Sequence, residues 1–145
     1  MQPKKALIDS LSREITQSGA KITVTTDIAA GVAGADFIYT DIWISMGEED
    51  EIAERLPLLL PYQVNSAMMQ MTHNPKTIFL HCLPSWHNME TEIGQQLYKE
   101  YGITALEVTD EVFYSDHSKV FQQAENRLHT IKAILLATLL PVNEL

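Results

Sequence analysis

Apolar residues recur at helical spacing near both ends of the chain. The first set precedes Gly19, which suits the left-handed position after a helix end, and comprises Leu7, Ile8, Leu11 and Ile15. In the second, Ser118 can cap a long helix that Pro141 closes. Its apolar stripe comprises Phe121, Ala124, Leu128, Ile131, Leu135 and Leu139. The pattern therefore predicts an amphipathic helix at each end.

Four runs between these helices have the apolar and β-branched composition of strands. They are Lys21–Thr26, Phe37–Trp43, Thr77–His81 and Ile103–Val108. The run Phe37–Trp43 is too continuously apolar for a half-exposed strand, so we expect it to be buried on both faces of a sheet. Pro84 stops the third run shortly after His81.

Helical segments alternate with these runs. Asp27 can cap a short Ala/Gly-rich turn, and acidic residues Glu48–Glu51 precede a helix that Pro57 can kink. Asn65 can cap a helix through Met71, and the segment 91–101 is helical in pattern and ends at Gly102. Alternating strands and helices predict an α/β fold: a three-layer α/β/α domain with a central, mostly parallel, Rossmann-like sheet.

The composition excludes several classes of protein. The chain has 145 residues, 46% of them hydrophobic and 20% charged, which suits one globular domain spanning residues 1–145. The formal net charge is -9 and no basic stripe is present, so we expect no nucleic-acid partner. The apolar stretch Ala133–Val142 is about half the length of a membrane span. The single Cys82 excludes an internal disulfide, and we expect a cytoplasmic location without a membrane partner.

Polar side chains follow two of the predicted strands, where ligands collect in open α/β sheets. Asp41 lies within an otherwise apolar run, so it either caps backbone groups or binds a ligand. Ser45 and Met46 precede Gly47 and either form a simple turn or belong to a binding loop.

The tetrapeptide His81-Cys82-Leu83-Pro84 places a thiol beside an imidazole at the end of a predicted strand. Adjacent strand residues point to opposite faces, so Cys82 is either an inert buried residue or part of a catalytic site. Arg127 on the last predicted helix either forms a surface salt bridge or contacts a ligand. The histidine and cysteine spacing matches no local metal motif, and no dinucleotide or phosphate-loop fingerprint occurs, so we expect neither metal nor cofactor.

Several blocks together resemble the second half of an ornithine carbamoyltransferase. Asp41–Glu48 resembles the ornithine loop of that family, and residues 62–65 resemble the start of its next helix. His81–Pro84 resembles the signature tetrapeptide, and residues 107–113 and 123–133 complete the set in the family's order. The resemblance covers about residues 3–140.

The resemblance implies transfer of a carbamoyl group from carbamoyl phosphate to the side-chain amine of ornithine, which gives citrulline and phosphate in arginine and ornithine metabolism. By position, Asp41, Ser45 and Met46 would bind ornithine. Carbamoyl phosphate would contact Cys82, Leu83 and Arg127, and Cys82 and Arg127 would be the catalytic residues.

The family also has an N-terminal domain with a Ser-x-Arg-Thr-Arg phosphate loop, which this sequence does not contain. We therefore expect the chain to be inactive alone and to act with that domain, in an enzyme that the resemblance implies to be a homotrimer. Two alternatives remain open: a stand-alone amino-acid-binding module, and a carbamoyltransferase for another amine such as putrescine.

Overall fold

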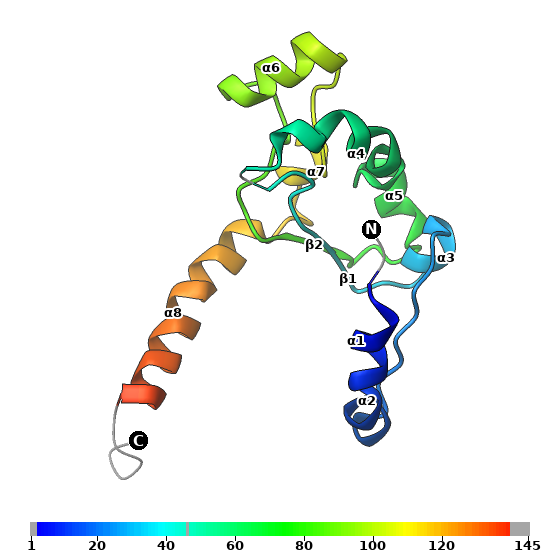
Figure 1. The fold of residues 1–145 in the computed structure, drawn as a ribbon, viewed down its shortest axis with the longest axis vertical. Coiled ribbons are helices and arrows are strands. Elements are labelled where there is room, and N and C mark those ends of the chain that lie inside the picture. The colour runs from blue at the N-terminus through cyan, green and yellow to red at the C-terminus, as the bar shows by residue number, and fades with distance from the viewer. Residues whose placement is uncertain (1–2, 46, 140–145) are drawn as a thin grey trace.

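A two-stranded parallel sheet lies at the centre of the computed structural model, which describes residues 3–45 and 47–139. β1 (Phe37–Thr40) pairs with β2 (Ile78–His81), with Phe37 beside Ile78 and Thr40 beside His81. Helices lie beside these strands without enclosing them (Figure 1). The chain therefore has the predicted α/β character, with a small parallel sheet.

Eight α-helices and two short 3-10 helices occur in the described part of the chain. They are α1 (Lys5–Ser10), α2 (Ser12–Ser18), α3 (Ile28–Val32), η1 (Glu49–Glu51), α4 (Ile52–Leu59), η2 (Leu60–Tyr62), α5 (Ser66–Met71), α6 (Glu92–Tyr101), α7 (Asp110–Phe113) and α8 (Val120–Leu139). The predicted end signals of four helices are confirmed. Asp27 accepts from the Ala30 N–H at 3.0 Å, and Asn65 accepts from the Met68 N–H at 3.0 Å. Gly19 and Gly102 have φ values of 71° and 70°, where the missing Cβ avoids strain.

Two apolar clusters hold the described residues together. The larger one joins the sheet to α5, α7 and the start of α8, and comprises Ile38, Val64, Met68, Phe79, Val108, Val112, Phe113 and Val120. The smaller one packs α4 against α6 through Leu56, Leu97 and Leu106. Both clusters lie on the side of the sheet that carries α4 to α7, so that half of the molecule is the better packed (Figure 1).

Three strand predictions were wrong or too long. Lys21–Thr26 has no regular secondary structure and pairs with no strand among the described residues, and Ile103–Val108 contributes only a bridge from Val108 to Val64. The predicted strand Phe37–Trp43 ends at Thr40. Its side chains are not buried on both faces, because Phe37 and Tyr39 are exposed on one face and only Ile38 is buried on the other. A strand pattern thus remains unpaired where no partner strand is available.

Both predicted terminal helices also differ in detail. The first is split at Leu11 into α1 and α2. The last begins at Val120, because Ser118 instead bridges Phe79 of β2, and the Ser118 hydroxyl is buried without a hydrogen-bond partner among the described residues.

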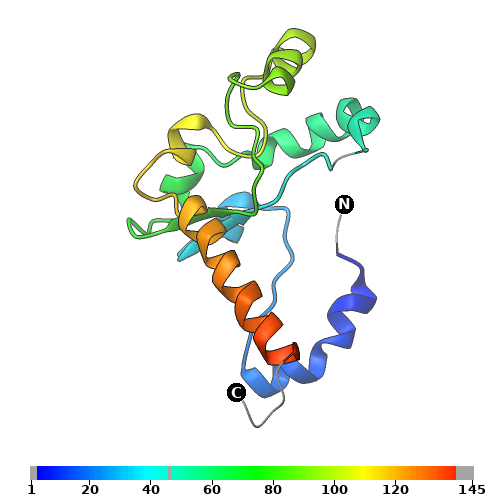
Figure 2. The ribbon, with the colours of Figure 1, turned by 90° about the vertical axis from the view of Figure 1, so that its left-hand side faces the viewer.

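The apolar stripe of α8 is exposed to solvent. Leu128 and Leu135 keep 55% and 50% of their surface accessible. Figures 1 and 2 both show α8 and the α1–α2 pair extending beyond the sheet, away from α6. Within the described residues, no helix is both long and apolar enough to cross a membrane.

Candidate functional site

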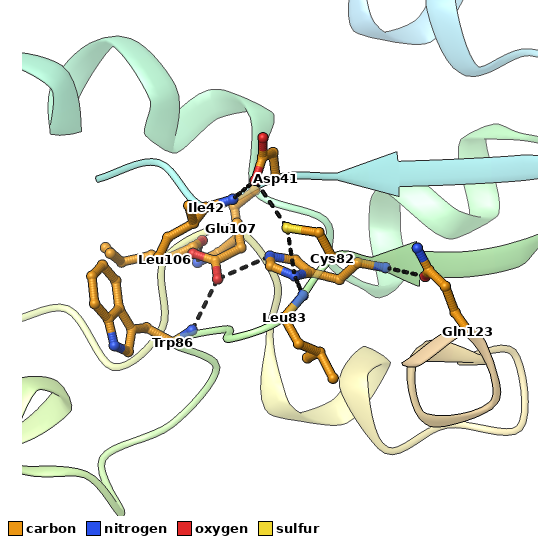
Figure 3. A network of polar contacts seen from close by, with 10 residues as sticks. Asp41, Ile42, Cys82, Leu83, Trp86, Leu106, Glu107 and Gln123 are labelled. Atoms are coloured by element: carbon orange, nitrogen blue, oxygen red, sulfur yellow. Dashed lines mark hydrogen bonds and ion pairs between the residues drawn. The ribbon is translucent and has the colours of Figure 1, made fainter. Parts of the chain in front are cut away.

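Asp41 and Cys82 meet at the carboxyl ends of the two strands. Because β1 and β2 are parallel, the residues that follow them lie at the same edge of the sheet. The Cys82 thiol donates a hydrogen bond to Asp41 Oδ1 at 2.9 Å, and the Ile42 N–H donates to the same oxygen at 2.8 Å (Figure 3). Asp41 therefore accepts a local backbone bond and is also part of a contact between strands.

The environment of Asp41 and Cys82 shifts the pKa values of both side chains. The hydrogen bond from Cys82 and the backbone bond from Ile42 hold the pKa of the Asp41 carboxyl below its ordinary value, although desolvation opposes them. Burial raises the pKa of the Cys82 thiol, and the Asp41 carboxylate raises it further. At neutral pH the site thus presents a carboxylate beside a neutral thiol, which is a weak nucleophile.

The His81 side chain contacts residues of the turn after β2 and of the segment around Glu107. Its Nδ1 accepts from the Leu83 N–H at 2.8 Å, while the Cys82 sulfur lies 3.9 Å away. His81 Nε2 lies 3.2 Å from Glu107 Oε1, without the alignment of a linear hydrogen bond, and both side chains are fully buried. The same oxygen accepts from the Trp86 N–H at 2.9 Å (Figure 3). His81 therefore positions the loop, and the geometry gives Cys82 no free base.

Leu83 has an unusual backbone conformation for a residue with a side chain. Its φ is 54°, in the left-handed region, which costs about 1–3 kcal/mol for a residue other than glycine. The bond from its N–H to His81 and its packing against the larger apolar cluster hold it there. Strain of this kind concentrates at binding sites, so the turn is a candidate ligand contact.

Arg127 faces the same region from α8. A hollow of about 470 Å³ is lined by His81 and Cys82 from the end of β2 and by Gln123 and Arg127 from α8. The Gln123 side-chain oxygen accepts from the His81 N–H at 3.1 Å and so ties α8 to β2. No carboxylate pairs with Arg127 among the described residues, so the surface salt bridge that the sequence allowed is not formed.

The loop after Asp41 is held from one side by Arg55. This guanidinium donates to Glu48 at 2.6 Å and to the Trp43 carbonyl at 3.2 Å, and it pairs with Glu51 at 2.5 Å. The pKa of the Glu48 carboxyl is lowered by this partner. Ser45 is exposed and does not line the hollow of Cys82 and Arg127.

Of the six residues that the sequence suggested, Cys82 hydrogen-bonds to Asp41 and lines one hollow with Arg127, and Leu83 follows Cys82 in the turn after β2. Ser45 lies apart, and Met46 is outside the described residues. In the described part of the chain, no three His, Cys, Asp or Glu side chains converge as a set of metal ligands.

Sequence reasoning assigned no role to Glu107, Gln123 or Arg55. Glu107 could have been singled out from the sequence, because it is a lone carboxylate in the apolar run 105–108. Asp41 stands out in the same way in the run Phe37–Trp43. Gln123 lies beside Gln122 and Arg55 beside Glu54, and nothing in their local pattern separates them from surface residues.

A model of the aspartate/ornithine carbamoyltransferase Asp/Orn binding domain matches residues 1–138. The chain belongs to the aspartate/ornithine carbamoyltransferase family. An ornithine carbamoyltransferase of Staphylococcus aureus (strain Mu50) is 56% identical over 140 residues, which are 96% of this chain and 42% of that protein. The catabolic ornithine carbamoyltransferase of Bacillus licheniformis is 53% identical over 137 residues, 94% of this chain and 41% of that protein.

A solved structure agrees with the family assignment. The ornithine carbamoyltransferase from Pyrococcus furiosus superimposes with a TM-score of 0.73 at 36% identity, over 92% of this chain and 37% of that one. The chain therefore spans less than half the length of the relatives that it matches.

Proposed function

We propose that this chain is the ornithine-binding domain of an ornithine carbamoyltransferase. One observation carries the proposal: Cys82 and the unpaired Arg127 line one hollow at the edge of the sheet where Asp41 lies. A free guanidinium suits a phosphate or a carbonyl oxygen, and a carboxylate suits an ammonium group. The two charges match the two substrates that the family's chemistry requires.

Asp41, together with Ser45 and Met46 of the following loop, binds ornithine in this proposal. The lowered pKa of Asp41 supports that role, because a carboxylate that stays ionised can pair with an ammonium of the substrate. The attacking side-chain amine must be neutral, so a site that desolvates it favours the reactive form.

Cys82, Leu83 and Arg127 contact carbamoyl phosphate. The amine lone pair forms a bond to the carbamoyl carbon, the bond from that carbon to the phosphate oxygen breaks, and phosphate leaves with the electron pair. The nitrogen loses a proton, and citrulline is the product. Arg127 stabilises the negative charge that develops on oxygen. Cys82 acts as a neutral thiol beside the reacting groups, and its raised pKa supports a role without a covalent carbamoyl-cysteine.

The chain completes this site with a separate carbamoyl phosphate domain, as part of a cytoplasmic homotrimeric enzyme of arginine and ornithine metabolism. Alone it lacks that domain's phosphate loop and is inactive, because positioning the two substrates supplies much of such catalysis. In the complete enzyme its helices and sheet form the three-layer α/β/α arrangement. The exposed stripe on α8 supports this, since a monomeric protein rarely leaves so continuous an apolar face uncovered.

A chimeric enzyme tests the proposal directly. The chain replaces the matched 140 residues of the Staphylococcus aureus relative, and citrulline formation from ornithine and carbamoyl phosphate is measured. We expect activity in the chimera and none in the isolated chain. Arg127→Gln lowers kcat/KM about 100-fold or more, on the scale of a lost oxyanion contact. Arg13→Gln, which changes an exposed arginine of α2, is the control and retains activity.

Three outcomes would contradict the proposal. Putrescine used in preference to ornithine would assign a different acceptor. Binding of ornithine to a chimera without turnover would favour the amino-acid-binding module. Equal effects of the Arg127 and Arg13 changes would remove Arg127 from the site.

A further inference from the structure

A hollow of about 250 Å³ lies between α4 and α6, apart from the candidate site. Its apolar walls come from the start of α4, from α6 and from the loops that follow β1 and β2. They comprise Ile44, Ile52, Trp86, Ile93, Leu97 and Tyr101. None of these residues lines the hollow that contains Cys82 and Arg127. The α4–α6 hollow is therefore a further cavity, built entirely by elements of this chain.

The walls of the α4–α6 hollow are held in place by burial and by backbone hydrogen bonds. Ile44 is buried, and Leu97 belongs to the smaller apolar cluster. The Leu106 N–H donates to the Trp86 carbonyl at 2.8 Å, and the Trp86 N–H donates to Glu107 at 2.9 Å. Because both backbone groups of Trp86 are bonded, its aromatic side chain projects from a fixed position. The hollow thus has the preformed apolar lining of a small-molecule site.

Two polar side chains complete the lining of the α4–α6 hollow. Gln96 and Glu100 of α6 both line it, and neither side chain has a hydrogen-bond or ion-pair partner within residues 3–45 and 47–139. Glu100 lies in the last turn of α6, where the helix dipole adds partial negative charge. Lys99 of the same turn is exposed and is not a lining residue. The hollow therefore favours a cation over an anion.

We infer that the α4–α6 hollow binds a small arylalkylammonium ion. The ammonium group pairs with the Glu100 carboxylate at the end of α6, and the aromatic body packs against Trp86 and Tyr101. Aromatic walls also attract a cation directly, so they favour the charged end of the ligand as well. A carboxylate or phosphate ligand would face Glu100 without a basic lining residue to offset it. This binding site goes beyond the proposed function and does not depend on it.

Titration of the 145-residue chain with phenethylammonium tests this inference. Binding is followed by NMR, and we expect saturable shifts of the Ile44, Trp86 and Tyr101 amides. The Arg127 amide, from the separate hollow, is the internal control and shifts much less. Phenethyl alcohol and hydrocinnamate carry the same ring with a neutral and a negative group. We expect both to bind at least about 5-fold more weakly, on the scale of an exposed ion pair.

Matched variants separate the charge of Glu100 from the shape of the hollow. Glu100→Gln removes the lining carboxylate, and Glu90→Gln removes an exposed carboxylate that does not line the hollow. We expect Glu100→Gln to weaken phenethylammonium binding at least about 5-fold and Glu90→Gln to leave it nearly unchanged. Ile93→Phe enlarges a lining side chain that is 46% exposed, so it should block binding while the chain still folds. If Ile93→Phe does not fold, the two glutamate variants decide.

Specific outcomes would overturn the inference. They are the absence of saturable shifts at Ile44, Trp86 and Tyr101, equal or tighter binding of phenethyl alcohol or hydrocinnamate, and equal effects of the Glu100 and Glu90 changes. Failure of the proposed function is distinguishable, because phenethylammonium binding is measured on the isolated chain and needs no turnover. A chimera that forms no citrulline therefore leaves this site intact, and an active chimera does not rescue it if the probe does not bind.

Discussion

The two strands of the sheet are equally long, but their surroundings differ. Phe79 of β2 is fully buried, and its backbone pairs on the side away from β1 with the His117 carbonyl at 2.9 Å and the Lys119 N–H at 3.0 Å. β1 pairs on one side, and Phe37 is 61% exposed. The candidate site is divided in the same way. Its β2 half is held by a buried network, and its β1 half is held mainly by the loop contacts of Arg55.

The largest expected difference between the strands is in stability. Phe79→Ala should lower the free energy of unfolding by about 3–5 kcal/mol, because it empties a fully buried position. Phe37→Ala, the matched change on β1, should alter it by about 0.5 kcal/mol or less, because that side chain is mostly exposed in this chain. Urea unfolding of the two variants measures both values.

Equal losses for the two variants would contradict the comparison. A large loss for Phe37→Ala would mean that the open face of β1 is already covered in solution, for example by a second copy of the chain. Sedimentation of the unmodified chain at several concentrations would identify such self-association.

Asp41 tests whether the β1 half of the site binds substrate. Asp41→Asn keeps the shape and the oxygen that accepts from Cys82, and it removes the negative charge. A hydrogen bond to a charged group contributes about 1.5–3 kcal/mol, so kcat/KM for ornithine in the chimera should fall about 10- to 150-fold. The KM for carbamoyl phosphate should change much less.

Thermal melts of the same variant separate a ligand residue from a structural one. A role limited to capping the Ile42 N–H should cost about 0.5–2 kcal/mol of stability on removal. A destabilised Asp41→Asn variant that uses ornithine normally would therefore assign Asp41 to structure alone.

Local signals in the sequence predicted local features well. Asp27 and Asn65 cap their helices, and Gly19 and Gly102 end theirs, because each signal depends on a few adjacent residues. The strand prediction for residues 21–26 failed for a different reason. Strand pairing needs a neighbour that is distant in sequence, and no described residue supplies one.

In the candidate site, too, contacts between residues distant in sequence were harder to predict than local features. The order of polar residues indicated that the two strand ends matter, because ligands collect at the carboxyl ends of parallel strands, and the structure places Asp41 and Cys82 in contact there. The fully buried pair of His81 and Glu107 joins residues 26 positions apart and has no local signature. Arg55 holds the loop from a separate helix, so it also lay beyond a local pattern.

Helix caps provide a smaller test of the difference between the two halves. Asn65 and Asp27 each accept a backbone bond at 3.0 Å, but α5 buries Met68, whereas α3 beside the open edge buries no residue. Asn65→Ala should therefore cost about 1 kcal/mol, and Asp27→Ala should cost about 0.5 kcal/mol. Urea unfolding provides the values, and a larger loss for Asp27 would mean that α3 is better supported than its packing indicates.

The smallest expected effect concerns the pH dependence of Cys82. Burial is the larger cause of its raised pKa and the Asp41 carboxylate the smaller one. The rate of alkylation by iodoacetamide should therefore reach half its maximum above the ordinary thiol pKa of about 8.5. Asp41→Asn should lower that midpoint only in part, because burial remains, and a complete return to the ordinary value would show that the carboxylate dominates.

The thiol pKa of Cys82 is higher in the folded state than in the unfolded state. The contribution of Cys82 to stability is therefore present below about pH 8.5 and is lost as the pH rises through the folded pKa. Cys82→Ser should remove this alkaline loss in urea unfolding.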